Sequence, residues 1–328
     1  MFGAATPLIQ AFGMGYGPLT TAAVLYLGAA SSSFIRLGRK KAEASVARRH
    51  AARIVLVALL GAALAPVCLA WGLKHVGGAQ GSMLLNFEAP FAVFLAWRVY
   101  REPIGKRVAL AAALIVLGGA LLVMEGSALR RPSWGAIAVV CATLAWALDS
   151  TLSRPLAELD VAVVIRWKAV VGALLCIVLA LALGQRFPTR SGILGLLACG
   201  ATGYGLSLRL YLLAQRRIGA ARTASIFAMA PFVGVLVAWM MGDRSMGVQG
   251  FLAMGFFGTG ICLHLTERHK HAHLHEPLEH EHLHRHDDEH HDHLHEPPFV
   301  GEHSHTHMHR EREHEHEHAP DAHHVHSH

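Results

Sequence analysis

Residues 84–123 read LLNFEAPFAVFLAWRVYREPIGKRVALAAALIVLGGALLV. A short basic loop joins two apolar runs, and the first run contains an acid, Glu88, and a proline, Pro90. A membrane-spanning helix needs about 20 predominantly apolar residues, and each run has close to that length. The stretch therefore predicts two membrane spans with one charged side chain inside the bilayer.

The same pattern occurs a second time, at residues 226–265, which read IFAMAPFVGVLVAWMMGDRSMGVQGFLAMGFFGTGICLHL. Ala89-Pro90-Phe91 matches Ala230-Pro231-Phe232 with an offset of 141 residues. That offset relates three further landmarks: Glu102 to Asp243, Gly119 to Gly260, and Gly78-Ala79 to Gly219-Ala220. One constant offset at four landmarks is more than a biased composition should produce, so we expect a duplicated membrane unit.

Charged residues are few and unevenly placed. Of the 328 residues, 53% are hydrophobic and 16% are charged. The tail from Glu267 onward holds 23 of the 26 histidines and 15 of the 23 acidic residues, so Met1–Thr266 keeps eight acids and 24 basic residues. A soluble core of this size needs more polar surface, which favours a multi-spanning membrane protein. The basic excess then indicates membrane topology, and no nucleic-acid partner is expected.

Ten apolar spans divide the body into two repeats. The first repeat covers residues 1–126, the second covers 127–266, and the tail covers 267–328. The predicted fold class is an all-α membrane protein with two inverted five-helix repeats, ten transmembrane helices in all, and a disordered histidine-rich tail. The spans are expected near residues 1–12, 17–36, 53–73, 79–99, 106–124, 134–152, 160–185, 191–213, 220–242 and 246–265.

Basic residues predict the orientation of these spans. Eighteen of the 24 body Lys and Arg residues lie in or beside the connections 2–3, 4–5, 6–7 and 8–9, and six lie on the opposite side. The positive-inside rule makes the first group cytoplasmic, and an even span count puts both termini and the tail in the cytoplasm of a bacterial inner membrane. Because five spans is an odd number, the second repeat must insert upside down, which is typical of transporters with a binding site near the midplane.

The first span is shorter than the others. About 12 residues cannot cross a bilayer. Pro7-Leu8 resembles Pro155-Leu156 with an offset of 148, which places Met1 opposite Asp149. We therefore expect this span to be truncated, lacking its opening ~15 residues.

The two copies of the opening stretch also carry a family resemblance. LLNFEAPFAVFLAW followed by REPIGKRVALAAALIVLGGALL resembles an EamA domain of the drug/metabolite transporter superfamily, and the resemblance covers Met1 to about Leu265. The ending HLTERHKHAHLHEPLEHEHLHRHDDEHHDH is similar to the tails of one subgroup with histidine-rich C-termini. The resemblance implies a central cavity that opens alternately to each side, driven by a coupled gradient and not by ATP, and it leaves the solute open.

Glu88 is the first candidate functional residue. A charged side chain in hydrocarbon costs about 2.5–3.5 kcal/mol on insertion scales, so it needs a reason to remain there. Its repeat counterpart is the apolar Met229, and Pro90 nearby removes a backbone donor and helps to form a cavity lining. Two interpretations stay open: a carboxylate that couples transport to protons or cations, or a structural acid that is protonated or hydrogen-bonded.

Other polar residues in the spans form a second group of candidates. Asp149 is expected at a similar depth to two basic residues, Arg166 and Lys168. These two are two positions apart, so only one of them easily faces Asp149. The alternatives are a structural ion pair, a cytoplasmic gate or a contact to a charge on the solute. Arg209 is expected to reach the cytoplasmic interface. The remaining cavity candidates are Asn86, Pro231, Ser82, Ser207, Tyr204 and Trp146.

The tail repeats His-x-His and is expected to bind a divalent transition metal, Zn, Ni, Co or Cu, because neutral imidazoles suit these ions. It would buffer or sense metal, feed the pore, or be a tolerated low-complexity extension. No cofactor is otherwise required. The candidate metal ligands are His269, His271, His273, His275, His280, His282, His284, His286, His290, His291, His293, His295, His303, His305, His307 and His309.

Three functional hypotheses follow, none of them an enzyme. The first is a secondary transporter, an exporter of a small metabolite or drug-like solute coupled to a proton or ion gradient, with the tail as metal binder. The second makes a transition metal the cargo and the tail its collector. The third is a non-transporting metal sensor in the membrane. The expected partners are a small solute and the lipid bilayer, and a homodimer stays open.

Overall fold

The chain folds into a helical bundle followed by short strands. The computed structural model describes residues 1–34, 48–100, 104–124, 133–153, 156, 159–218, 223, 226–244, 246–265, 270–275, 279–284, 303–308 and 312–317. The helices of the first repeat are α1 (Phe2–Gly13), α2 (Pro18–Ser32), η1 (Arg48–His50), α3 (Ala51–Ala58), η2 (Leu59–Leu64), α4 (Ala65–Leu73), α5 (Gly78–Leu84), η3 (Leu85–Phe87), α6 (Glu88–Tyr100) and α7 (Lys106–Met124). Those of the second repeat are α8 (Trp134–Ser153), α9 (Val161–Ala182), α10 (Arg190–Cys199), η5 (Gly200–Leu206), α11 (Ser207–Ile218), α13 (Ala230–Met240) and α14 (Val248–Leu265).

The prediction of an all-α membrane body is confirmed. Within the described residues, each predicted span coincides with one helix or with a run of consecutive helices. In the part of the chain that the structure describes, five helical stretches are long and apolar enough to cross a membrane, and two shorter apolar helices accompany them. The boundary expected at residue 126 falls outside the described residues and stays a prediction. The long stretches are Ala51–Leu73, Lys106–Met124, Trp134–Ser153, Ala162–Ala182 and Arg190–Tyr211.

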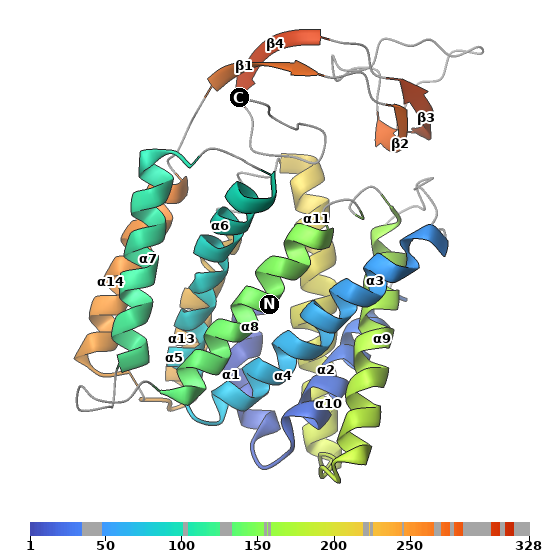
Figure 1. Ribbon diagram of the computed structural model, residues 1–328. Coiled ribbons are helices and arrows are strands. Elements are labelled where there is room, and N and C mark those ends of the chain that lie inside the picture. Colours follow the sequence, from blue (N-terminus) through green and yellow to red (C-terminus); the bar gives the residue numbers. More distant parts are fainter. Residues whose placement is uncertain are drawn as a thin grey trace.

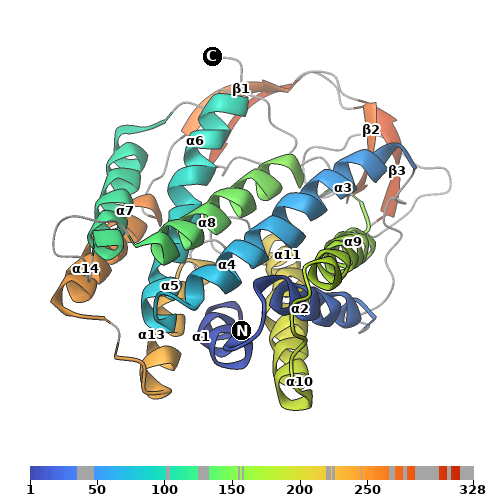
Figure 2. The same ribbon diagram turned by 60° about the horizontal axis from the view of Figure 1, so that its bottom comes forward.

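Helices from the two repeats pack against one another at several places in the bundle (Figure 1). The last helices of the repeats, α7 and α14, pack side by side at one edge. The second helices, α2 and α9, pack together near the opposite edge, and α4 packs on α8 between them. Helices α1, α5 and α13 pack against each other at the end of the bundle that Figure 2 brings forward. Each repeat therefore buries its apolar faces against the other.

Two spans end in left-handed glycines at that same end of the bundle. Gly184 (φ 61°) follows α9, and Gly242 (φ 92°) follows α13. The next residues return to the helices, since Gln185 N donates to Ala180 O (2.9 Å) and Asp243 N donates to Ala238 O (3.0 Å). Glycine adopts a positive φ without a steric cost, so it closes a helix in this way more easily than other residues.

Spans four and nine are interrupted at matching positions. In span four the short 3-10 turn η3 lies between α5 and α6, and in span nine a turn at residues 228–229 precedes α13. Pro90 and Pro231 follow these interruptions and are 141 residues apart. A proline lacks the backbone N–H and clashes with the carbonyl four residues earlier, so each proline disrupts the helix immediately before it.

Spans three and eight share a second irregularity. A π-helical segment, η2, begins at Leu59, and another, η5, begins at Gly200, again 141 residues later. A π-helix inserts an extra residue into a turn, is rare, and is frequently found at functional sites. The repeat therefore reproduces details of the backbone as well as the order of the helices.

The tail contains regular structure that the sequence analysis did not expect. Four strands are described: β1 (Lys270–His275), β2 (Glu279–His284), β3 (His303–Met308) and β4 (Arg312–Glu317). Strand β1 pairs with β4 and β2 pairs with β3, both antiparallel. The His-x-His pattern has the two-residue period of a strand. The rest of the tail lies outside the described residues, and its expected disorder stays a prediction.

Candidate functional site

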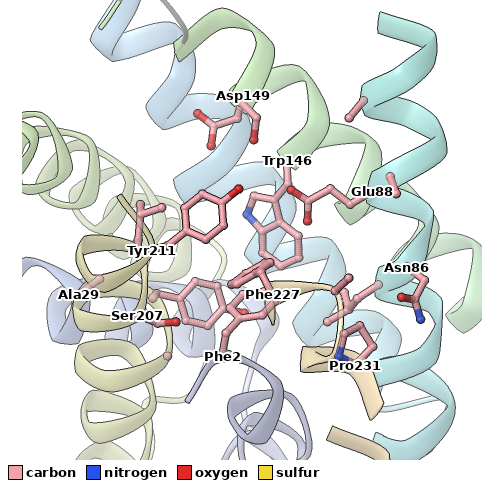
Figure 3. A pocket seen from close by; sticks show the side chains of 18 of the residues that line it. Phe2, Ala29, Asn86, Glu88, Trp146, Asp149, Ser207, Tyr211, Phe227 and Pro231 are labelled. Carbon is pink, nitrogen blue, oxygen red and sulfur yellow. The ribbon is translucent and has the colours of Figure 1, made fainter. Parts of the chain in front are cut away.

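A cavity of about 420 Å³ lies between the two repeats (Figure 3). Its walls come from both halves, and the interrupted spans four and nine each contribute to them. A volume in this range suits a small organic molecule. The lining residues are Phe2, Tyr26, Ala29, Leu85, Asn86, Glu88, Ala89, Ala92, Ile115, Trp146, Asp149, Ser150, Ile165, Lys168, Ala169, Gly203, Tyr204, Ser207, Leu208, Tyr211, Phe227, Ala228, Pro231 and Ile261.

The two prolines explain which residues the interrupted spans present to the cavity. The residue four positions before Pro90 is Asn86, and the residue four positions before Pro231 is Phe227. Both of these residues line the cavity. The disrupted turns therefore lie at the cavity wall, which is where transporter folds place discontinuous helices.

Aromatic side chains form a continuous cup on one side of the cavity. Phe2 packs against Tyr204 (ring centroids 5.7 Å apart) and Phe227 (5.1 Å). Tyr204 also packs against Tyr26 (5.7 Å) and Trp146 (6.0 Å). Tyr211 completes the cup at 5.0 Å from Phe227. We call these six rings, Phe2, Tyr26, Trp146, Tyr204, Tyr211 and Phe227, the aromatic cup.

A single backbone carbonyl anchors two rings of the aromatic cup. Tyr26 Oη donates to the carbonyl oxygen of Gly61 at 2.5 Å, and Trp146 Nε1 donates to the same oxygen at 3.0 Å. Gly61 lies in the π-helical segment η2, and both hydrogen bonds are buried. A carbonyl oxygen has two lone pairs, so it can accept both donors. The π segment of span three thereby fixes rings from α2 and α8.

An ion pair lies beside this anchor. Lys168 Nζ of α9 contacts Asp149 Oδ2 of α8, and the exposed fractions of the two side chains are 15% and 7%. Ser153 Oγ donates to Asp149 Oδ1 at 3.3 Å. Glycine is favoured at position 61, because a Cβ there would lie 2.1 Å from Asp149 Oδ2 and the carboxylate would have to shift. Asp149 therefore has its charge balanced and both carboxylate oxygens contacted.

Glu88 has a different environment. It begins α6 directly after the interruption of span four, and its half-buried side chain extends toward Trp146 in the cavity (Figure 3). The part of the chain that the structure describes offers no hydrogen bond or salt bridge to its carboxylate. Its position in the first helical turn favours a negative charge. The cavity thus contains one balanced pair of charges and one carboxylate without a counter-ion among the described residues.

The sequence candidates separate into two groups in the structure. Glu88, Asn86, Asp149, Lys168 and Pro231 line the cavity, as do Trp146, Tyr204 and Ser207. The remaining candidates are held elsewhere. The guanidinium of Arg166 lies 5.7 Å from the ring centroid of Phe34, Ser82 Oγ donates to Gly78 O (2.7 Å), Arg209 Nη1 donates to Ser32 O (3.1 Å), and Pro90 is buried in α6 outside the lining.

Four members of the aromatic cup were not identified from the sequence: Phe2, Tyr26, Tyr211 and Phe227. Each lies in an apolar run, where aromatic residues that face lipid and those that face a cavity look alike. One signal was present in the sequence, because Phe227 precedes Pro231 by four residues in the way that Asn86 precedes Pro90.

Possible metal ligands do not cluster in the bundle. Among the residues that the structure describes, no group of three or more His, Cys, Asp or Glu is placed to hold a metal ion. The tail ligands His269, His286, His290, His291, His293, His295 and His309 lie outside the described residues, and the others lie on the four strands.

Comparisons with known proteins agree with this architecture. A model of the EamA-like transporter family matches residues 1–124 and 133–266. An uncharacterized transporter from Methanothermobacter thermautotrophicus is 27% identical over 213 residues, which cover 61% of this chain and 60% of that protein. The match thus extends over about 60% of the length of that curated relative. A solved crystal structure shares the fold with a TM-score of 0.55 and 16% sequence identity, over 80% of this chain and 95% of that chain.

Proposed function

The chain belongs to the EamA-like transporter family, and from this membership we propose that it is a secondary active exporter of a small organic solute. The observation that carries the proposal is the cavity between the repeats, which is lined by the aromatic cup and contains the Glu88 carboxylate. A binding site enclosed by two repeats of opposite orientation can face each side of the membrane in turn. The proposed location is a bacterial inner membrane.

We assign the coupling role to Glu88. A carboxylate that lacks a counter-ion among the described residues can take up a proton on one side of the membrane and release it on the other. The charged groups nearest in the cavity are Asp149 and Lys168, which already contact each other. The ionisable hydroxyls in the lining are those of Tyr26, Tyr204 and Tyr211. Of the three charged groups, Glu88 can change charge without breaking this ion pair, and a carboxyl exchanges protons nearer neutral pH than a tyrosine hydroxyl does.

The distribution of basic residues supports the proposed orientation. Loops rich in Lys and Arg favour the cytoplasm, which would place the ends of α6 and α11 and the tail on the cytoplasmic side. The strands of the tail lie at that end of the bundle (Figure 1). An exporter in this orientation would load solute from the cytoplasm and exchange it for a proton from outside.

Transport can be tested in inside-out membrane vesicles from bacteria that express the full chain. Respiration acidifies the lumen of these vesicles, so a proton-coupled exporter should accumulate its solute there. The vesicles would be incubated with the small-molecule fraction of a cell extract, and their contents measured by mass spectrometry with and without a protonophore. We expect at least one solute to accumulate with the wild type and to disappear with the protonophore.

Glu88→Gln is the decisive variant, because it preserves side-chain size and removes the ionisable proton. We expect it to lose gradient-driven accumulation. Met229→Leu, at the repeat counterpart outside the lining, is the matched control and should transport normally. Accumulation by Glu88→Gln at the wild-type rate across pH would remove Glu88 from coupling, and no gradient-dependent solute with the wild type would refute transport.

We also propose that the tail binds divalent transition metal, supported by the register of its strands. Opposite positions in β2 and β3 pair His280 with His307 and His282 with His305. In β1 and β4 they pair His271 with His316 and His273 with His314. Directly opposite residues in an antiparallel pair have Cα atoms roughly 4.5–5.5 Å apart. With His284 opposite His303 as a third pair, the register places six histidines opposite one another in β2 and β3, and four in β1 and β4.

Cellular metal content tests whether the tail only binds metal or also serves a metal cargo. Zn, Ni, Co and Cu would be measured by elemental analysis in cells with the full chain and with a chain that stops after Thr266. We expect any change caused by the full chain to vanish with the tail. A change that persists in the shortened chain would make the metal itself the cargo.

A further inference from the structure

We propose that the solute is an organic cation with an aromatic or apolar body, bound with its charge beside Glu88 and its body in the aromatic cup. This inference rests on the proposed transport function and specifies the solute class of the same cavity. It is carried by two features that point in the same direction: the charge balance of the lining and the arrangement of its rings.

The charge balance favours a cation. Three lining side chains are charged when ionised, Glu88, Asp149 and Lys168. Lys168 and Asp149 contact each other, so their charges cancel and neither is free to hold an opposite charge on a solute. Glu88 is left with one negative charge and, among the described residues, with no counter-ion. A solute with a single positive charge would neutralise the cavity, whereas an anion would face the Glu88 carboxylate in a poorly screened environment.

The rings favour the same charge. The face of an aromatic ring carries negative electrostatic potential and attracts a cation, and this attraction increases when water is excluded. The rings of the cup belong to α1, α2, α8, η5, α11 and the residue before the turn at 228–229, so both repeats contribute ring faces to one wall of the cavity. The same rings can stack against an aromatic body. A cation beside Glu88 can therefore be bound by charge, by ring faces and by apolar contact at once.

The hydrogen bonds already made in the lining favour a body with few polar groups. Tyr26 and Trp146 use their donors on the Gly61 carbonyl. Asn86 Nδ2 donates to Met83 O at 2.9 Å. Around these groups the wall is aliphatic, with Leu85, Ile115, Ile165, Leu208 and Ile261. The hydroxyls of Ser150, Ser207 and Tyr204 remain as possible partners. A sugar or another solute with many hydroxyls would therefore regain only part of the hydrogen bonds to water that it loses here, which costs free energy.

Equilibrium binding to the purified full chain in lipid nanodiscs tests the proposal without any gradient. Two soluble probes of similar size are benzyltrimethylammonium, a cation, and phenylmethanesulfonate, an anion. Isothermal titration calorimetry should show at least about tenfold tighter binding of the cation. Glu88→Gln should weaken cation binding by about tenfold, and Phe227→Leu should weaken it by a few-fold. Met229→Leu is the matched control and should leave the affinity unchanged.

The possible outcomes separate the solute class from transport itself. Equal affinities for the two probes, no detectable cation binding, or an unchanged affinity in both Glu88→Gln and Phe227→Leu would each overturn the proposal. Glu88-dependent accumulation of a neutral or anionic solute in vesicles would also overturn it, while leaving the transporter intact. Cation binding without gradient-driven accumulation of any solute would instead refute the transport function.

Discussion

The two repeats have matching backbones and different chemistry. Spans four and nine are interrupted before prolines 141 residues apart, yet the first interruption carries Glu88 and the second carries Met229, which is 54% exposed and lies outside the cavity lining. The ion pair lies entirely in the second repeat, on α8 and α9. Duplication therefore explains the shape of the cavity, whereas the charges in it belong to one half or the other. Substitutions at paired or neighbouring positions test this difference.

The largest effect on stability is expected from breaking the ion pair of the second repeat. Lys168→Met leaves the buried Asp149 carboxylate without its counter-ion, so the free energy of unfolding should fall by about 3–5 kcal/mol. It can be measured by titrating the protein in mild detergent micelles with sodium dodecyl sulfate. Arg166→Met, two residues earlier on α9, is the control and should cost much less. Equal losses of unfolding free energy in the two variants would show that the ion pair does not stabilise the bundle.

A smaller effect is expected at paired positions in the two π-helical segments. Gly61 corresponds to Thr202 by the offset of 141, but Gly61 is buried against Asp149 whereas Thr202 is exposed. Gly61→Ala forces a Cβ into the carboxylate and should cost about 1–3 kcal/mol. Thr202→Ala should stay within about 0.5 kcal/mol. Similar losses of unfolding free energy in the same titration would mean that positions 61 and 202 are equally tightly packed.

The next effect compares one tyrosine from each repeat. Tyr26→Phe removes the hydroxyl that donates to Gly61 and should cost about 0.5–1.5 kcal/mol. Tyr204→Phe keeps the ring of the second repeat, whose hydroxyl has no hydrogen bond to the described residues, and should change stability by less than about 0.5 kcal/mol. If Tyr204→Phe lost more stability than Tyr26→Phe, the Gly61 carbonyl would not be the anchor of the aromatic cup.

The smallest effect concerns a contact between the repeats. Asp243, in the loop after α13, accepts a hydrogen bond from Ala79 N at the start of α5 (3.0 Å). Asp243→Asn keeps an acceptor but removes a charge that is favourable at a helix N-terminus, so we expect a loss of about 0.3–1 kcal/mol. Asp160→Asn, which alters the N-cap of α9 within the second repeat, should cost a similar amount. A loss confined to Asp160→Asn would show that the contact between repeats does not stabilise the bundle.

The sequence predicted the fold well because hydrophobic length is a strong signal in a membrane. The spans expected near residues 106–124 and 134–152 are the helices Lys106–Met124 and Trp134–Ser153. The turn at η3 and the π-helical segments were not predicted. Their hydrogen-bond pattern depends on neighbouring helices, and an apolar run looks the same whether its backbone is α-helical or π-helical.

The site was predicted in part: its charged residues were identified from the sequence, and most of its aromatic residues were not. Glu88, Asp149 and Lys168 stood out because charges in hydrocarbon are costly. The choice between Arg166 and Lys168 as partner of Asp149 required the structure, which places Arg166 over Phe34. The rings of the cup could not be separated from rings that face lipid, since the sequence gives no helix rotation.

The paired π-helical segments also bear on the evolutionary origin of the two repeats. A π turn contains one residue more than an α turn, so each segment corresponds to a single inserted codon. The two segments begin at Leu59 and Gly200, at the same place in each repeat. Two independent insertions at one position are a less economical explanation than one insertion that was copied. The irregularity is therefore older than the duplication that produced the two repeats.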